Sequence, residues 1–298
     1  MAVMLLFLCA AAGCSDTQGN PDMKDPEETD TIVIGGKPFN EQYILAEMLG
    51  LLLKEEGYKT EIKSGMNDIT LFEGIKKGQV DVYVEYTGTA YSQLLKRPSL
   101  TTWDPDVVYN DVVTGLSKED ITVLCRLGFR NDYTIAVRED WADKNNVSTI
   151  DDLVPYAKDM VFGSDLVFHE RKDGLPRIEE VYGFTFGDVK PMSPALVYEA
   201  IANKKVDAIP PYTTDSRVDL YNLRTLDDPK SALPPYESMI MIRDGLAGNE
   251  RVTSALLVLE NRIDTETMRS LNAEFDGEKR DARAIAKDYL IGEGLIAG

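Results

Sequence analysis

The chain has 298 residues and a formal net charge of −19, with 51 Asp and Glu against 32 Lys and Arg and a single His. A hydrophobic fraction of 43% is enough to bury a core, and the length suits one large domain or two lobes. The acidic balance argues against nucleic acid and anionic membrane surfaces as partners, and one His with three Cys argues against a zinc site, a disulfide framework or a metal cofactor.

The N-terminal residues are typical of a lipoprotein signal. Residues 1–13 carry no charge, are mostly apolar and are too few to span a bilayer as a helix. They end in Ala11-Ala12-Gly13-Cys14, which resembles a bacterial lipobox. We therefore expect 1–14 to be a signal peptide with Cys14 as the lipidated residue, and the acidic stretch 15–30 to be a disordered linker. The alternative is a buried N-terminal strand with an incidental Cys.

Short apolar runs alternate with amphipathic segments from Thr31 onward, which predicts an α/β fold. The first elements expected are strands over 31–34, 58–63 and 80–84 and helices over 41–56 and 68–77. Asn40 is placed to cap the first helix and Gly57 to end it. Further along, Cys125 lies in an apolar run and is expected to be a buried, inert thiol.

Two segments, 71–87 and 197–213, repeat each other without a gap, so that Asp207 follows Asp81 by 126 positions. Each unit predicts a helix, a tight turn, a buried strand and then a Tyr-Thr pair just past the strand end. Ligands of open α/β sheets bind beyond the carboxyl ends of the strands. Two similar lobes would thus bring both Tyr-Thr pairs to one cleft, although the Pro210-Pro211 pair before the second tyrosine has no counterpart in the first unit.

Catalysis has little support in the sequence. His169 is the only imidazole, and no nucleophile elbow accompanies it, so an enzyme that uses His169 in a cleft is a minor alternative. Phe168-His169-Glu170-Arg171 is interpreted instead as the surface of a helix or loop. Acids such as Asp104 and Asp106 lack the spacing of a calcium loop and are interpreted as helix N-terminal residues.

The chain has 14 tyrosines, and four of them lie at predicted element boundaries: Tyr86, Tyr133, Tyr212 and Tyr236. Each alone is typical of a half-buried tyrosine with its hydroxyl at the surface. Together they indicate an aromatic box, which suits a quaternary ammonium because ring faces attract a cation that has no hydrogen to donate.

Several motifs resemble those of the extracytoplasmic glycine betaine/choline/proline betaine-binding proteins of ABC osmoprotectant importers. The resemblance covers nearly the whole chain after the linker. Its marks are Gly36-Lys37-Pro38-Phe39-Asn40-Glu41-Gln42-Tyr43, Val82-Tyr83-Val84-Glu85-Tyr86-Thr87-Gly88-Thr89, Asp173-Gly174-Leu175-Pro176, Thr214-Asp215 and Pro234-Pro235-Tyr236.

The resemblance implies a two-lobed type II periplasmic-binding-protein fold with a ligand cleft between the lobes. It implies a first lobe of 31–130 plus 232–298 and a second lobe of 131–231. The site residues that it implies are a cation cage of Tyr86 and Tyr236 from the first lobe with Tyr133 and Tyr212 from the second, a carboxylate clamp of Lys37, Thr89 and Arg171, and the backbone of Asn131 lining the cage.

The same resemblance implies a binding protein rather than an enzyme, without cofactor. It would be monomeric, extracytoplasmic and held at the membrane only by its lipid, delivering a betaine- or choline-type ligand to an ABC permease and its ATPase subunit. In such a site Lys37 and Arg171 face the ligand's carboxylate, while the acids form mainly a solvating exterior. A signalling receptor domain of the same fold is the competing interpretation.

Overall fold

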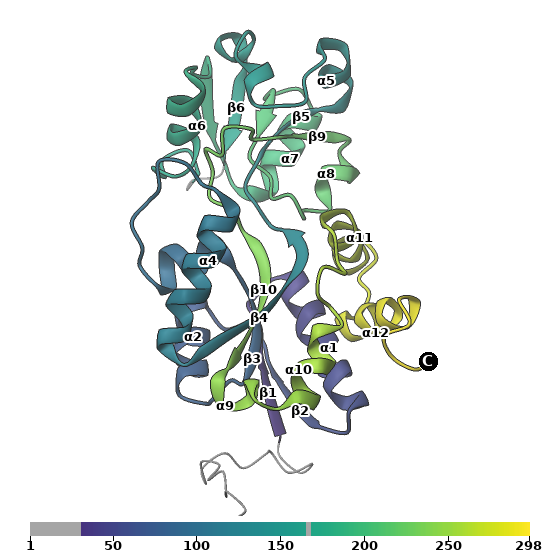
Figure 1. Ribbon diagram of the computed structural model, residues 1–298. Helices are drawn as coiled ribbons and strands as arrows, with labels where there is room; N and C mark the ends of the chain where they lie inside the picture. Colours follow the sequence, from purple (N-terminus) through teal and green to yellow (C-terminus); the bar gives the residue numbers. More distant parts are fainter. Residues whose placement is uncertain (1–30, 165–167) are drawn as a thin grey trace, which may run out of the picture.

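The computed structural model describes residues 31–164 and 168–298. The predicted signal peptide, linker and lipidated Cys14 lie outside the described residues. The chain forms two α/β lobes, one above the other in Figure 1, and each lobe is built on a five-stranded mixed sheet. Within the described residues, no helix combines the length and apolar character needed to cross a membrane.

The first sheet has the strand order β2-β1-β3-β10-β4. Its strands are β1 (Thr31–Gly35), β2 (Lys59–Lys63), β3 (Val82–Tyr86), β4 (Ile121–Arg130) and β10 (Glu237–Arg243). Strands β2 and β3 pair parallel with β1, whereas β10 runs antiparallel between β3 and β4. The late strand β10 therefore returns the chain to the first lobe.

The second sheet has the order β7-β6-β8-β5-β9. Its strands are β5 (Ile135–Arg138), β6 (Val161–Ser164), β7 (Asp188–Pro191), β8 (Ala208–Ile209) and β9 (Leu223–Leu226). Strands β7 and β8 pair parallel with β6, and β5 runs antiparallel between β8 and β9. Both lobes thus have the same topology, and the predicted two-lobed α/β fold is confirmed.

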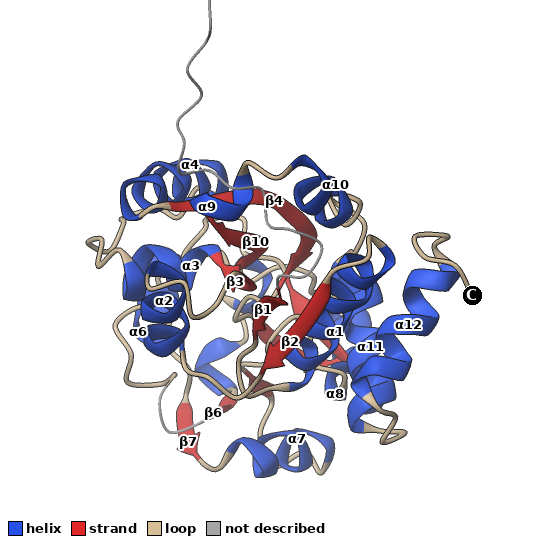
Figure 2. Ribbon diagram, turned by 90° about the horizontal axis from the view of Figure 1, so that it is seen from below, coloured by secondary structure: helices blue, strands red, loops and turns tan. Residues whose placement is uncertain are grey.

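Helices cover both faces of each sheet (Figures 1 and 2). Those of the first lobe are α1 (Asn40–Glu55), α2 (Asp68–Lys76), α3 (Thr87–Thr89), α4 (Pro105–Leu116), α9 (Asp244–Ala247), α10 (Glu250–Leu257), α11 (Thr265–Asp276) and α12 (Ala282–Gly292). Those of the second lobe are α5 (Glu139–Asn145), α6 (Leu175–Tyr182), α7 (Pro194–Ala202) and α8 (Arg217–Leu220).

Alternation along the strands divides the first lobe's core into two layers. Val82, Val84 and Tyr86 of β3 pack on the face covered by α1 and the C-terminal helices, whereas Tyr83 packs on the opposite face with α2 and α4. This period of two places the Tyr86 ring beside α1. Cys125 of β4 is 2% exposed, as expected of an inert thiol, and burial raises its pKa to about 12.

The predicted repeat is present in three dimensions. Helices α2 and α7 begin and end at positions that differ by 126, as do Asp81 and Asp207. Asp81 accepts a hydrogen bond from the backbone N–H of Val33 at 2.7 Å, and Asp207 accepts one from that of Val161 at 3.0 Å. In each lobe the aspartate just before the strand of the repeat unit (β3 or β8) therefore ties that strand to the parallel strand beside it (β1 or β6).

Three local expectations were wrong in detail. Helix α1 starts at Asn40 itself and has Phe39 as its N-cap, so Asn40 is not the cap. Strand β3 extends through Tyr86, which lies within the strand rather than just past its end. Phe168 is not a surface residue: it is 1% exposed and packs against the Tyr133 ring at 4.9 Å.

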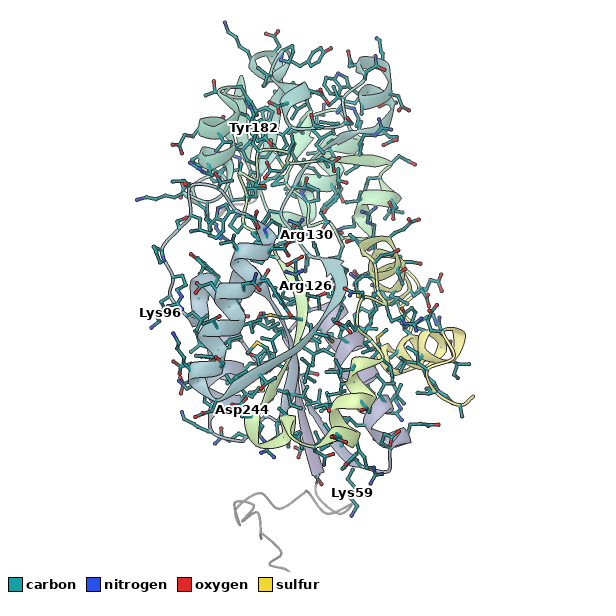
Figure 3. All side chains as sticks on the ribbon, in the orientation of Figure 1. Lys59, Lys96, Arg126, Arg130, Tyr182 and Asp244 are labelled. Carbon is teal, nitrogen blue, oxygen red and sulfur yellow. The ribbon has the colours of Figure 1, made fainter. Side chains whose placement is uncertain are left out.

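Two connections join the lobes side by side. Arg130, at the end of β4, lies between the lobes in Figure 3 and pairs with Asp132 at 2.6 Å. The backbone N–H of Asn131 donates to the carbonyl of Tyr236 at 3.0 Å, and Asp132 Oδ1 accepts from the Tyr236 N–H at 2.5 Å. The predicted lobe boundaries fall in these connections and stay a prediction.

Candidate ligand-binding site

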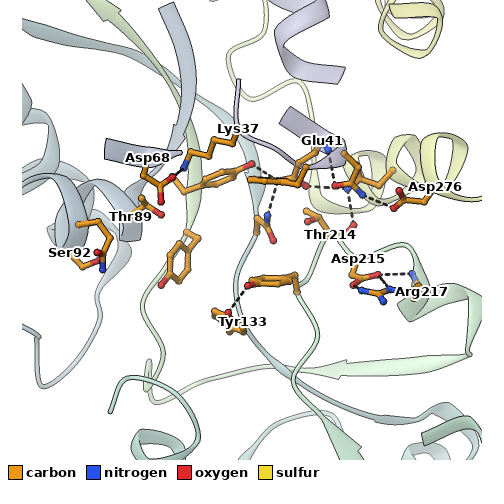
Figure 4. A pocket seen from close by; sticks show the side chains of 18 of the residues that line it. Lys37, Glu41, Asp68, Thr89, Ser92, Tyr133, Thr214, Asp215, Arg217 and Asp276 are labelled. Atoms are coloured by element: carbon orange, nitrogen blue, oxygen red, sulfur yellow. Dashed lines mark hydrogen bonds and ion pairs between the residues drawn. The ribbon is translucent and has the colours of Figure 1, made fainter. Parts of the chain in front are cut away.

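A cavity of about 840 Å³ lies between the two lobes (Figure 4). Both lobes and both connections contribute to its lining. The residues predicted for the cage and the clamp all line it: Lys37, Tyr86, Thr89, Asn131, Tyr133, Arg171, Tyr212 and Tyr236. Residues that are far apart in sequence are therefore brought to a single cavity, while the roles predicted for them remain to be tested.

Tyr86 is a buried, hydrogen-bonded part of the lining. Its side chain is 3% exposed, and its hydroxyl donates to Glu41 and accepts from Gln42 Nε2 at 3.0 Å. Phe39 stacks on the ring with centroids 6.2 Å apart. Burial and the neighbouring Glu41 carboxylate raise the pKa of Tyr86 well above its ordinary value, so the phenol is neutral at physiological pH.

The other three tyrosines form a group of rings. The Tyr133 centroid lies 4.4 Å from that of Tyr212 and 6.4 Å from that of Tyr236, and the Tyr212 hydroxyl donates to that of Tyr133 at 2.5 Å. The backbone aligns Tyr133 with Tyr212, because the Thr134 N–H donates to the carbonyl of Pro211 at 3.1 Å. Pro211 therefore extends the pairing of β5 with β8 through its carbonyl and keeps Tyr212 beside Tyr133.

The turn after β3 explains the Tyr-Thr-Gly-Thr run. The Thr87 hydroxyl donates to the carbonyl of Pro235 and accepts from the N–H of Glu237, both at 3.0 Å. A Cβ at Gly88 would lie 2.7 Å from the Pro235 carbonyl oxygen and 2.8 Å from the ring of Tyr236. Only glycine allows this approach, so the run holds Tyr236 against the first lobe.

Lys37 lies in the cavity wall with its charge already matched. Its side chain is 4% exposed, and its ammonium contacts Asp68 at 2.8 Å and the carboxylate of Glu85. Burial disfavours the charged form, but the two carboxylates outweigh burial and raise the pKa of Lys37. The ammonium also lies 4.9 Å from the centroid of the Tyr86 ring.

Arg171 enters from the second lobe, in the turn before α6. Asp173 accepts from its Nε at 2.9 Å and from its Nη2 at 2.7 Å, and the guanidinium carbon lies 5.7 Å from the Tyr133 centroid. This fork uses two of the five guanidinium donors. Gly174 permits the turn, because a Cβ there would meet the Phe168 carbonyl at 2.3 Å.

The acidic side chains in the lining are the part that sequence reasoning missed. Glu41, Asp68, Asp215 and Asp276 line the cavity, so the acids are not confined to the exterior. Glu41 and Asp215 lie in the motifs that carry the resemblance, but only the folded chain shows that they face the cavity.

Two further lining residues come from helices that the sequence analysis did not connect with the site. Arg217 of α8 lines it and forms two hydrogen bonds with Asp215, at 2.9 Å from Nε and 2.6 Å from Nη2. Asn272 comes from α11, whose Arg269 donates to the Thr213 carbonyl in the second lobe at 3.0 Å. Nothing in the local sequence around Asn272 distinguishes it from an ordinary helix residue.

His169 does not belong to this lining. It precedes Arg171 in the chain, and its Nε2 lies 3.6 Å from Glu170. In the described part of the chain, no group of three or more His, Cys, Asp or Glu is arranged to hold a metal ion.

Comparison with known proteins gives the family. Residues 30–292 match the model of the substrate binding domain of the ABC-type glycine betaine transport system. The chain belongs to this family. Its members are transport substrate-binding proteins, not enzymes, which supports a non-enzymatic role.

Two curated relatives differ in their ligands. The chain is 31% identical over 90% of its length to the ergothioneine transport permease/ergothioneine binding protein EgtU of Helicobacter pylori, but it spans only 48% of that relative. It is 30% identical over 90% of its length to the carnitine transport binding protein OpuCC of Listeria monocytogenes and covers 89% of that protein.

Solved structures agree on the fold. A glycine betaine/carnitine/choline ABC transporter structure matches with a TM-score of 0.84 at 28% identity, covering 89% of this chain and 99% of that one. The apo structure of YehZ from Escherichia coli matches with a TM-score of 0.79 at 28% identity, covering 90% and 100%.

Proposed function

We propose that this protein captures a small quaternary-ammonium solute of the betaine or choline type between its lobes and delivers it to an ABC permease. The observation that carries the proposal is the convergence of four tyrosines and of Arg171, from both lobes and both connections, on one cavity. The relatives named for glycine betaine and carnitine support the same ligand class.

The tyrosine rings supply the cation site. Each ring face contributes roughly 0.5–2 kcal/mol to a cation within about 6 Å of its centroid, more where water is excluded. Tyr133, Tyr212 and Tyr236 lie close enough to one another to share one ammonium group, with Tyr86 facing the same cavity from the first lobe. A quaternary ammonium loses no hydrogen bonds on entering such a box, which favours it over a primary amine.

Arg171 is the main carboxylate partner in this proposal. Its fork with Asp173 uses two of the five N–H donors and a further one faces the Tyr236 hydroxyl, which leaves the rest of the guanidinium for a ligand carboxylate. Lys37 and Thr89 contribute from the first lobe, and Lys37 contributes less because two protein carboxylates already contact its ammonium.

A ligand held by both lobes would favour their closed arrangement. Ligand binding shifts an equilibrium between open and closed forms only by its difference in affinity for the two. A betaine that contacts Tyr86 in one lobe and Tyr212 and Arg171 in the other gains contacts on closure, and this supplies the difference. The permease would then recognise the closed form.

Location and assembly follow from the same function. We propose an extracytoplasmic protein, anchored through Cys14, that works as a monomer with the permease and its ATPase subunit. Metabolic labelling with a fatty acid analogue tests the anchor: the wild-type protein should be labelled and a Cys14→Ser variant should not.

The choice among ligands rests on what lies beyond the ammonium group. Glycine betaine, proline betaine, carnitine and ergothioneine all carry a carboxylate, whereas choline carries a hydroxyl. Because Arg171 lines the cavity, we expect the carboxylate-bearing ligands to bind more tightly than choline. The relative named for ergothioneine places that larger betaine on the list to be tested.

Calorimetric titration of the purified protein with these five compounds tests the proposal. We expect saturable binding of at least one of the betaines, with one ligand per chain. An absence of heat and of any thermal stabilisation with all five would contradict it.

Replacing Arg171 tests the clamp. We expect Arg171→Ala to weaken glycine betaine by about tenfold more than it weakens choline, because only the former presents a carboxylate. Arg177→Ala, in the neighbouring helix α6 and outside the cavity lining, is the matched control. Equal losses for both ligands in Arg171→Ala would remove Arg171 from the clamp.

A further inference from the structure

Glu41 is a buried carboxylate in the wall of the cavity. It lies in the first turn of α1 and is 1% exposed. Its Oε1 accepts from the Tyr86 hydroxyl and from Asn131 Nδ2 at 2.8 Å, and its Oε2 accepts from Asn272 Nδ2 at 3.1 Å. All three of these donors are uncharged. Figure 4 shows Glu41 at the centre of this set of bonds.

The other buried or half-buried acids around the cavity have cationic partners. Asp68 pairs with Lys37, and Asp215 pairs with Arg217. Glu41, by contrast, has no ion pair with any lysine or arginine of the described residues. Buried charges in proteins are normally paired, because removing a carboxylate from water is costly. The neutral donors and the N-terminal end of α1 stabilise the anion, but they do not neutralise it.

The two amides that hold Glu41 leave further acceptors nearby. Asn131 and Asn272 both turn their NH₂ groups toward Glu41, and the Oδ1 atom of each is buried without a hydrogen-bond donor in the described part of the chain. Both residues line the cavity. This wall thus presents a carboxyl group without a cationic partner and two orphan acceptors.

We infer that Glu41 supplies the fixed negative charge by which the site selects a cationic ligand, resting on the proposed function. A trimethylammonium group carries the missing positive charge, and its polarised methyl C–H groups match acceptors that receive no stronger donor. The Tyr86 hydroxyl connects the Glu41 carboxylate with the aromatic rings, because its donation to Glu41 makes the Tyr86 ring more electron-rich and the ring face more attractive to a cation.

A role for Glu41 in selection can be tested by comparing ligands that have the same shape but differ in charge. Aromatic rings alone also accept a neutral tert-butyl group, which has the size of a trimethylammonium group but no charge. A buried anion discriminates between the two. The site should therefore prefer choline strongly over its neutral carbon analogue 3,3-dimethylbutan-1-ol, and glycine betaine over 3,3-dimethylbutanoate, and Glu41 should account for much of each preference.

The test measures these two preferences by calorimetry in the wild-type protein and in Glu41→Gln. The change removes the charge and keeps the size of the side chain, and the substituted amide reaches an orphan Oδ1 when the facing asparagine amide flips. We expect Glu41→Gln to weaken choline and glycine betaine about tenfold while changing the affinity of each carbon analogue less than twofold. Glu47→Gln makes the same change on the same helix outside the cavity, where Glu47 pairs with Arg283, and should change neither preference.

A second variant keeps the test decisive if Glu41→Gln folds poorly. Glu41→Asp retains the charge on a shorter side chain, so both preferences should stay within about threefold of wild type even if all affinities fall. Preferences that are unchanged in Glu41→Gln, or lost in Glu41→Asp, would overturn the assignment. Failure of the wild-type protein to bind any quaternary ammonium would instead overturn the proposed function.

Discussion

Strand β3 of the first lobe and strand β8 of the second occupy the same place in their sheets, yet β3 has five residues and β8 only two. The difference begins where Val84-Glu85 of one repeat unit becomes Pro210-Pro211 in the other. Proline has no N–H to donate, so β8 ends early. The two lobes thus share the same strand arrangement and differ in the residues at the end of this strand.

The two repeat tyrosines differ accordingly. Tyr86 is 3% exposed and hydrogen-bonded to Glu41 and Gln42, whereas Tyr212 is 41% exposed and rests on Tyr133. A buried ring contributes to folding as well as binding, while an exposed ring can be reserved for the ligand. In the proposed cage, the first lobe would therefore supply a preformed half and the second lobe a half with an open face.

Removing each ring should give the largest effect and the clearest contrast. We expect Tyr86→Ala to lower the free energy of unfolding by about 3–5 kcal/mol, since a large buried side chain leaves a cavity, and to abolish measurable betaine binding. Tyr212→Ala should weaken binding at least tenfold with less than about 1 kcal/mol of destabilisation. Denaturant unfolding and calorimetry measure both quantities.

Tyr109→Ala is the control for this pair, because the Tyr109 ring carries the Arg126 guanidinium at 3.8 Å outside the cavity. It should leave betaine affinity unchanged. If it weakens binding as much as Tyr212→Ala does, the cage tyrosines are ordinary structural residues and the comparison fails.

The repeated aspartates should differ less than the tyrosines. Asp81 and Asp207 make equivalent backbone bonds and each also accepts from an arginine, Arg243 and Arg138 respectively, but their side chains are 9% and 35% exposed. We expect Asp81→Ala to cost about 3 kcal/mol and Asp207→Ala about 1 kcal/mol, because solvent screens the second. Unfolding free energies that are equal, or ranked in reverse, would show that the two sheets do not depend on their aspartates as described.

Gly88 tests how the first lobe holds Tyr236. Its counterpart in the second repeat unit is Thr214, so only the first lobe needs a glycine at this point. We expect Gly88→Ala to destabilise the fold by about 1–3 kcal/mol and to weaken betaine binding about tenfold, because the added Cβ displaces the Tyr236 ring. Gly248→Ala, where an added Cβ meets nothing within 4 Å, should affect neither quantity.

The smallest expected effect concerns stability and pH at Glu41. Burial raises the pKa of Glu41 above its ordinary value despite the hydrogen bonds that oppose the rise. A carboxyl with a raised folded-state pKa stabilises the fold fully below its unfolded-state pKa, and this contribution is lost as the pH rises through the folded-state pKa. Glu41→Gln should therefore raise the melting temperature by about 2–4 °C near pH 8 and by less near pH 4.

The pH dependence is read as the difference between variant and wild type, because Glu85 and Asp132 also have pKa values raised by burial and contribute equally to both proteins. If the gain in melting temperature does not grow with pH, ionisation of Glu41 does not destabilise the wild-type fold, and the prediction is wrong.

The sequence was sufficient for the scaffold and for part of the cavity lining, namely the tyrosines, Lys37, Thr89, Asn131 and Arg171. The ungapped repeat predicted two similar lobes, because helix, turn and strand are encoded by local residues such as Val80 and Asp81. The resemblance placed Tyr86, Tyr133 and Arg171 in one cleft, where the folded chain brings them together.

What could not be predicted depends on contacts between distant segments. The pairing of Lys37 with Asp68 and Glu85 requires three separate elements to meet, and the overall charge balance hides it. Glu41 lies within a recognised motif, but its burial depends on Asn272 from the C-terminal part of the chain. The net charge suggested a solvating exterior, whereas part of the acidic content shapes the cavity.

The most direct test of the central claim is a crystal structure of the protein with glycine betaine. We expect the ammonium nitrogen within about 6 Å of the ring centroids of tyrosines from both lobes, including Tyr86 and Tyr212, and the carboxylate on Arg171. A ligand bound to one lobe alone, or outside the cavity between the lobes, would contradict the account.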